Sequence, residues 1–219
     1  MNKSRGSSQT RCLPAVDCHP RGAYRPGILR VRKLMDAAAA LFMEHGISET
    51  TIDDIVARAG IAKATFYHYF ASKHALLDAL REDLIERCNT QILQAVSACP
   101  EDDLHQRLMT WVRSTAETRI HTMAIADVVF SEEGCPLHWT VSGEPFMKYI
   151  VALLQKGNRC GAWSVKKPAL AATLFFHGMF GVQDDVILRG GDPKSVTADI
   201  VDFALQAVYG RPAAHHSKP

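Results

Sequence analysis

The chain has 219 residues, of which 47% are hydrophobic and 22% are charged, and its formal net charge is +2. This is the composition of an ordinary globular protein with one or two domains. The apolar runs are short and interrupted, which excludes a membrane span, and the polar N-terminus lacks the apolar core of a secretory signal. We therefore expect a cytoplasmic protein.

The six cysteines, at positions 12, 18, 88, 99, 135 and 160, are expected to be reduced thiols, because the chain shows no export signal. Their spacings match no zinc site. The nearest approach to a cluster is Cys12, Cys18 and His19, which a tail explains better than a metal site does.

Residues 1–27 mix Ser, Arg, Gly and Pro without periodicity, which predicts a disordered arm. Residues 1–32 hold seven basic side chains and one acidic side chain, a balance of +6 that leaves −4 on the other 187 residues. A basic arm on a mildly acidic body suits contact with a polyanion, although basic tails are common.

Residues 28–75 predict three helices and the start of a fourth. The first helix begins near Ile28 and ends at Gly46, a residue type that readily takes the left-handed conformation of a helix end. Its apolar stripe is formed by Val31, Leu34, Met35, Ala38, Leu41 and Phe42, which recur at intervals of three and four. Thr51 followed by Asp54 is a capping box that opens the second helix, closed by Gly60.

Residues 63–69 are too few for an independently stable helix, so packing must hold them, with Phe66 and Phe70 as anchors. Ser72 caps the next helix, which runs to about residue 97 and is long enough to link two domains.

Beyond Pro100 the helical pattern continues over roughly 102–121, 123–131, 142–157, 168–189 and 193–209. Gly190 and Gly191 stop one helix, and Asp192 with Pro193 starts the last. There is no strand-like alternation and no internal repeat, so we predict an all-α fold with about nine helices.

The two short helices separated by Gly60 have the form of a helix-turn-helix, the most specific signal in the chain. The second one carries small residues at Ala62 and Ala64, which allow a backbone to approach a duplex closely. Lys63 and Thr65 stand at its N-terminal end, where base edges or phosphates are within reach, and residues 67–69 follow on the exposed arc. The alternative is a helical hairpin whose Tyr and His side chains only solvate a surface.

Residues 29–77 resemble the DNA-binding domain of the tetracycline-repressor (TetR/AcrR) family of bacterial transcription regulators. The resemblance covers about a quarter of the chain and is carried by Ala37-Ala38, Leu41-Phe42, Gly46, Thr50-Thr51, Ile55, Ala59-Gly60-Ile61, Thr65 to Phe70, Ser72-Lys73 and Leu76-Leu77. The chain departs from the family at His74-Ala75, where an acidic residue is common, and in the long arm before residue 28.

The resemblance implies a role for each matching position. Four positions are implied to contact phosphates: Thr51, Tyr67, Tyr69 and Lys73. Four others lie where the family reads bases: Lys63, Ala64, Thr65 and His68. It also implies a domain order of arm (1–27), DNA-binding domain (28–75), C-terminal ligand-binding and dimerisation domain (76–210) and tail (211–219).

The C-terminal region carries no motif of comparable strength, and its two expected sites rest on the resemblance. The dimer face is expected on the last two helices, at Phe175, Met179, Val182, Ile200, Phe203, Ala204 and Ala207. The candidates for lining a ligand pocket are Met109, Trp111, Met123, Phe130, Trp139, Phe146, Tyr149 and His177. An ordinary intramolecular core is the alternative for the dimer residues, and for each pocket candidate taken singly it is the better explanation.

The resemblance implies a homodimeric, sequence-specific regulator, by family default a repressor that a small, largely apolar effector releases from a palindromic operator at the bacterial nucleoid. The alternative is a constitutive DNA-binding protein without an effector. The sequence has no nucleophile elbow, phosphate-binding loop, dinucleotide fingerprint or His-Glu-x-x-His motif, so we expect no enzyme, no cofactor and no metal.

Overall fold

The computed structural model describes residues 26–130 and 144–209, and all of the secondary structure in these two ranges is helical. The eight α-helices are α1 (Pro26–His45), α2 (Ile52–Ala59), α3 (Lys63–Tyr69), α4 (Lys73–Ser97), α5 (Leu104–Val129), α7 (Pro145–Cys160), α8 (Pro168–Leu188) and α9 (Thr197–Tyr209), and η2 (Pro193–Val196) is a short 3₁₀ helix. The predicted all-α fold is confirmed.

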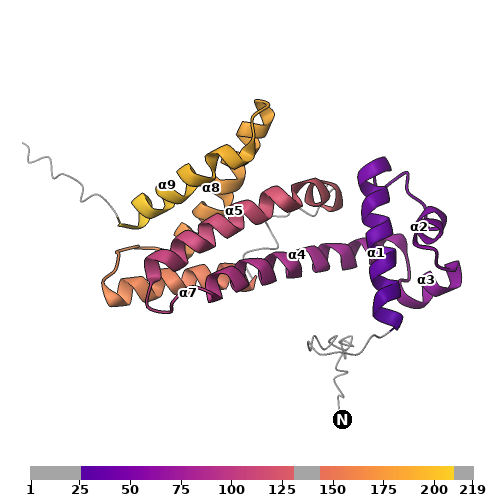
Figure 1. Ribbon diagram of the computed structural model, residues 1–219, viewed down its shortest axis with the longest axis horizontal. Helices are drawn as coiled ribbons and strands as arrows, with labels where there is room; N and C mark the ends of the chain where they lie inside the picture. The colour runs from indigo at the N-terminus through magenta and orange to yellow at the C-terminus, as the bar shows by residue number, and fades with distance from the viewer. Residues whose placement is uncertain (1–25, 131–143, 210–219) are drawn as a thin grey trace, which may run out of the picture.

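The molecule is elongated, with α1, α2 and α3 gathered at one end (Figure 1). Helix α4 runs from that end along α5 and α7, α8 packs against α7 and α5, and α9 packs against α5. The buried apolar side chains form two clusters, one joining α1–α3 to the first half of α4, the other joining the second half of α4 to α5, α7, α8 and α9. Helix α4 therefore belongs to both cores.

Local signals set the ends of α2. The Thr51 hydroxyl accepts a hydrogen bond from the Asp54 amide at 3.2 Å, and the Asp54 carboxylate accepts one from the Thr51 amide at 2.9 Å. At the other end Gly60 takes a φ of 64°, which a glycine adopts without the steric cost of a Cβ atom. The predicted capping box is thus present, and it fixes the entry of the chain into the helix-turn-helix.

Helix α5 is continuous from Leu104 to Val129, so the predicted break between residues 121 and 123 is wrong. No Gly or Pro occurs in this stretch to interrupt the helix. The Thr122 hydroxyl donates to the Thr118 carbonyl one turn earlier, at 2.8 Å, so this polar side chain is satisfied within the helix. The far end of α5 reaches the N-terminal core, where Ala126 and Val129 are buried.

The C-terminal core is built around Trp111, whose indole N–H donates to the Phe146 carbonyl at 2.9 Å and satisfies its one donor. Helix α7 continues this core and ends beside Trp163, against which Gly157 lies so closely that an added Cβ would stand 1.9 Å from the ring. None of the described helices is long and apolar enough to cross a membrane.

The expected arm lies outside the described residues, except that Pro26 and Gly27 already belong to α1. The tail at 211–219 and the candidate Trp139 lie outside them too. Cys88, Cys99 and Cys160 are free thiols. Within the two described ranges, no three His, Cys, Asp or Glu side chains cluster as a metal site requires.

Candidate nucleic-acid interface and internal cavity

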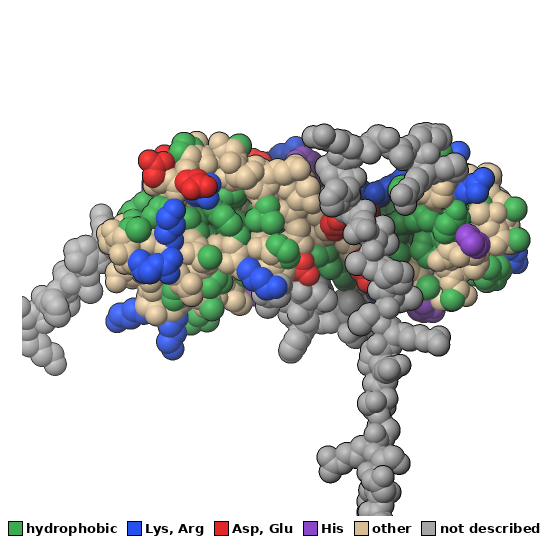
Figure 2. All heavy atoms as spheres, turned by 90° about the horizontal axis from the view of Figure 1, so that it is seen from below, with side chains coloured by type: hydrophobic (Ala, Val, Ile, Leu, Met, Phe, Trp, Pro, Cys, Tyr) green, Lys and Arg blue, Asp and Glu red, His purple; other side chains and the backbone are tan. Residues whose placement is uncertain are grey.

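Helix α3 turns one face into the core and leaves the other to solvent. Phe66 and Phe70 are buried with their ring centroids 5.8 Å apart, and they anchor a helix of only seven residues. The residues expected to face DNA all keep some exposure, with Lys63, Ala64, Tyr67 and His68 exposed and Thr65 and Tyr69 half-buried. The view of one face in Figure 2 shows basic and histidine side chains at this end of the molecule.

Lys63 is held over the first turn of α2. Its ammonium lies 2.8 Å from a carboxylate oxygen of Asp53, and both side chains are exposed. The hydrogen bond to Asp53 raises the pKa of Lys63, so the side chain is cationic at neutral pH. An exposed pair of this kind is weak, which leaves the lysine available to exchange its partner for a phosphate or a base.

The Thr51 hydroxyl makes both of its hydrogen bonds to Asp54 within the capping box. Its hydroxyl donates to the Asp54 carboxylate at 2.6 Å while accepting from the Asp54 amide. These hydrogen bonds, first from the hydroxyl and then from the backbone amide, lower the pKa of Asp54. Thr51 and Asp54 thus cap the N-terminus of α2, which is the positive end of its helix dipole.

Lys73 ties the start of α4 to the loop between α1 and α2. Its ammonium donates to the carbonyl oxygens of Ile47 at 2.6 Å, Thr50 at 2.8 Å and Ser48 at 3.3 Å. The lysine therefore fixes the position of Thr51 relative to α4. A phosphate contact by Lys73 remains a prediction, and it would share the ammonium with these three carbonyl groups.

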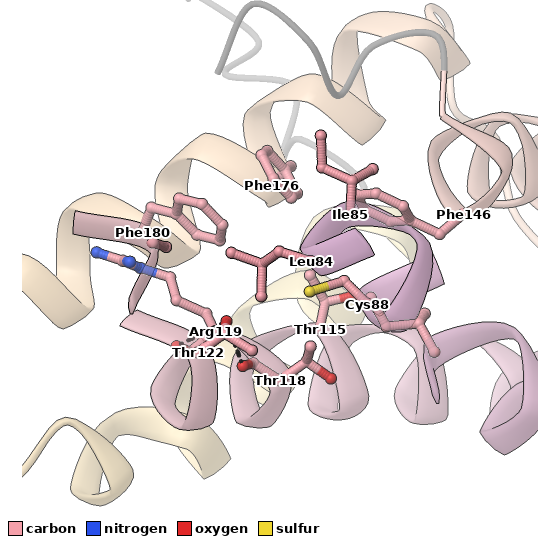
Figure 3. A pocket seen from close by; sticks show the side chains of 12 residues that line it. Leu84, Ile85, Cys88, Thr115, Thr118, Arg119, Thr122, Phe146, Phe176 and Phe180 are labelled. Atoms are coloured by element: carbon pink, nitrogen blue, oxygen red, sulfur yellow. Dashed lines mark hydrogen bonds between the residues drawn. The ribbon is translucent and has the colours of Figure 1, made fainter. Parts of the chain in front are cut away.

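A cavity lies between α4, α5, α7 and α8 (Figure 3). Its volume is about 50 Å³, which is small for an organic ligand. The lining side chains are mostly apolar: Leu84, Ile85, Cys88, Ile92, Thr115, Thr118, Arg119, Thr122, Ala126, Phe146, Phe176 and Phe180. Burial raises the pKa of the Cys88 thiol, so it remains protonated.

Of the residues predicted to line a pocket, Phe146 is the one that lines this cavity. Trp111 is fully buried in the core, and Tyr149 accepts a hydrogen bond from Arg107 at 3.1 Å. Phe130 ends α5 beneath the Arg81 guanidinium. Met109, Met123 and His177 are half-buried elsewhere on α5 and α8.

Sequence reasoning missed the cavity residues on α4, α5 and α8. One usable signal was the set Thr115, Thr118, Arg119 and Thr122, which the helical period brings to neighbouring positions on one side of α5.

A second groove of about 440 Å³ runs along the outer side of α8 and α9. Six of the seven predicted dimer residues line it: Phe175, Met179, Val182, Ile200, Phe203 and Ala204. Phe203 is 68% exposed and Val182 is 45% exposed, whereas the other four are buried. Ala207 is exposed and lies beyond the groove.

Residues 34–80 match the family model described as bacterial regulatory proteins, tetR family. The chain is 41% identical over 63 residues to the uncharacterized HTH-type transcriptional regulator YvdT of Bacillus subtilis, covering 29% of this chain and 32% of that protein. It is 32% identical over 98 residues to the HTH-type transcriptional regulator BetI of Escherichia coli, covering 44% and 50%. The chain thus spans half or less of the length of these curated relatives.

Solved structures extend the similarity in fold to most of the chain. The fatty acid degradation regulator FadR from Bacillus halodurans superposes with a TM-score of 0.68 at 19% identity, covering 87% of this chain and 100% of that one. The regulator FadR from Bacillus subtilis, solved in complex with stearoyl-CoA, gives 0.65 at 14% identity, covering 81% and 98%. At these identities the likeness establishes the fold alone.

Proposed function

We propose that this chain, whose residues 34–80 match the tetR family, is a transcription regulator that binds a palindromic operator as a homodimer and is released by a small ligand. The observation that carries the proposal is the setting of α3. Two buried phenylalanines hold the helix while its N-terminal and outward positions carry small, polar and basic side chains. A major groove about 12 Å wide admits such a helix.

Each outward position has a chemical role in this proposal. Lys63, Ala64, Thr65 and His68 face base edges, where the small Ala64 permits close approach and the others donate or accept hydrogen bonds. Thr51, Tyr67, Tyr69 and Lys73 contact phosphates on either side of the groove, which fixes the register of α3 without reading sequence.

Lys63 gives up Asp53 when it engages DNA. Because that ion pair is exposed, the exchange costs little.

Dimerisation through the outer face of α8 and α9 supports the palindromic operator. The exposed apolar side chains Phe203, Val182 and Leu174 surround the groove there, and a second copy of the same surface would bury all of them. Two α3 helices in such a dimer would enter successive major grooves about 34 Å apart, which is one helical turn.

The position of the cavity supports control by a ligand. Leu84 and Ala126 line the cavity and also belong to the N-terminal core that holds α3. A ligand that widens the cavity by displacing α4 or the end of α5 would shift that core, and it changes DNA affinity only by binding the two conformers differently. A coupling of about 1–3 kcal/mol is the usual scale. The B. subtilis FadR, a protein of the same fold, was solved in complex with stearoyl-CoA, a ligand that carries a long acyl chain.

The alternative is a constitutive DNA-binding protein with the same fold and no effector. The small size of the cavity favours this alternative, because its volume is only about 50 Å³. A thermal-shift screen separates the two. Saturable stabilisation by a compound that also weakens DNA binding supports the ligand-controlled regulator.

Selection of bound sequences from a random DNA library tests the proposal. We expect a two-fold palindrome with half-sites about one turn apart. Lys63→Ala and Tyr67→Phe should each weaken binding to the selected site while leaving the dimer intact. A library that yields no consensus, with binding lost at moderate salt, would reject the sequence-specific reader.

A further inference from the structure

One end of the internal cavity carries a single charged side chain. Among the twelve lining residues Arg119 is the only charged one, and it lies beside Phe180, while Phe146 and Cys88 lie toward the other end (Figure 3). The cavity therefore has a cationic end and an apolar body.

The Arg119 guanidinium is buried but incompletely satisfied. Its side chain is only 9% exposed, and the guanidinium carbon lies 4.3 Å from the centre of the Phe180 ring. It is paired with Asp184, which is 52% exposed and so lies toward solvent. Among the described residues, the Arg119 Nε–H has no hydrogen-bond partner. A buried donor without a partner is costly, and a guanidinium fork can accommodate a second carboxylate beside the first.

A second unpaired polar atom lies on the same wall. The Thr118 hydroxyl oxygen is buried, lines the cavity and has no hydrogen-bond partner among the described residues. Thr122, one turn farther along α5, already donates its hydroxyl to the Thr118 carbonyl. The Arg119 Nε–H and the Thr118 O–H are thus two buried donors without a partner among the described residues, both on residues that line the cavity.

We propose that the effector is an amphipathic anion, with a carboxylate on Arg119 and an apolar chain extending past Leu84 toward Phe146. The inference rests on the proposed function, since it names the chemical class of ligand for the same cavity. A neutral apolar molecule would leave the Nε–H unsatisfied, and a cation would be repelled by the guanidinium. The carboxylate supplies an acceptor for the Arg119 Nε–H, while Asp184 remains on the solvent side.

The small size of the cavity means that a bound chain would move the surrounding helices. The apolar chain requires more room than the cavity's volume of about 50 Å³ provides, so binding must move helices that line it. Leu84 and Ala126 connect that wall to the N-terminal core. In this proposal the carboxylate at Arg119 provides the binding affinity, and the apolar chain beside Leu84 displaces the helices that line the cavity.

Calorimetric titration of the full-length protein with decanoate, decanamide and decylamine tests the chemical class. We expect saturable binding of decanoate and at least tenfold weaker binding of the other two, because they lack the carboxylate. Decanoate should also lower the affinity for the DNA selected from the random library, whereas decylamine should not.

Two variants with matched controls locate the head group. Arg119→Met should weaken decanoate binding by about tenfold to a hundredfold, the span expected for a lost hydrogen bond between charged partners. The control is Arg189→Met, which removes an equal charge from an exposed pair with Asp185 on the same helix as Asp184. Asp184→Asn should tighten decanoate binding several-fold by removing the competing anion, while Asp185→Asn should not.

The outcomes separate this inference from the function on which it rests. Equal binding of decanoate and decanamide, or an unchanged decanoate affinity in both Arg119→Met and Asp184→Asn, would overturn the anionic class. If Arg119→Met fails to fold, Asp184→Asn still decides the question. Failure of the wild-type protein to select any DNA sequence would instead overturn the proposed function.

Discussion

Replacing Lys73 by methionine isolates the connection between α4 and the loop before α2. The change keeps the aliphatic stem but removes the ammonium that donates to the Ile47, Thr50 and Ser48 carbonyls, two of them within 2.8 Å. A hydrogen bond from a charged donor contributes about 1.5–3 kcal/mol when well formed. Partial exposure reduces this value, and a cation near the N-terminus of a helix is unfavourable by about 0.3–1 kcal/mol.

The net loss expected for Lys73→Met is about 1–2 kcal/mol of unfolding free energy in the absence of DNA. It should be measured by chemical denaturation, with hydrogen exchange of the backbone amides at residues 47–54 as the local readout. Lys63→Met is the matched control, because it removes the same charge from an exposed pair with Asp53 and should change stability and exchange much less. Equal stability and equal exchange in the two variants would refute the reasoning and leave Lys73 free for phosphate contact.

Three further predictions concern local structure and assembly. Thr51→Ala should lower the unfolding free energy by about 1 kcal/mol by removing the α2 cap, as measured by denaturation. Hydrogen bonds from Thr51 depress the folded-state pKa of Asp54, so the stability that Asp54 contributes is full above its unfolded pKa near 4 and declines as the pH falls through the lower folded value. Thr51→Ala should flatten that decline. Gly157→Ala should lower the melting temperature, since the new methyl would overlap the Trp163 ring unless the ring moves. Phe203→Asp should raise the dimer dissociation constant in sedimentation without lowering the subunit's helix content, because this side chain is exposed in the single subunit.

The helix-turn-helix could be predicted from the sequence because its signals are local. A capping box, a glycine turn and an alternation of buried and exposed positions each involve residues within one or two helical turns. Thr51, Gly60 and Phe66 accordingly lie where the pattern placed them. Their conformation depends on residues close to them in the sequence, so it can be predicted from the sequence alone.

The cavity could not be predicted in the same way, because it depends on which faces of four distant helices meet. Trp111 is a large aromatic residue of the kind that often lines ligand pockets, yet it is fully buried in the core. Arg119 gives no local sign that it borders a cavity until α8 brings Phe180 and Asp184 against it. The same limit applies to the length of α5, whose far end is buried by the N-terminal core.

The central claim is that α3 reads bases rather than only binding phosphates. The most direct test is the ratio of the dissociation constants for scrambled and selected DNA of equal length, measured by fluorescence anisotropy at physiological salt. We predict that the wild-type protein prefers the selected site by about a thousandfold or more, and that His68→Ala reduces this ratio. Equal affinity for both duplexes, with the same steep dependence on salt, would contradict the account.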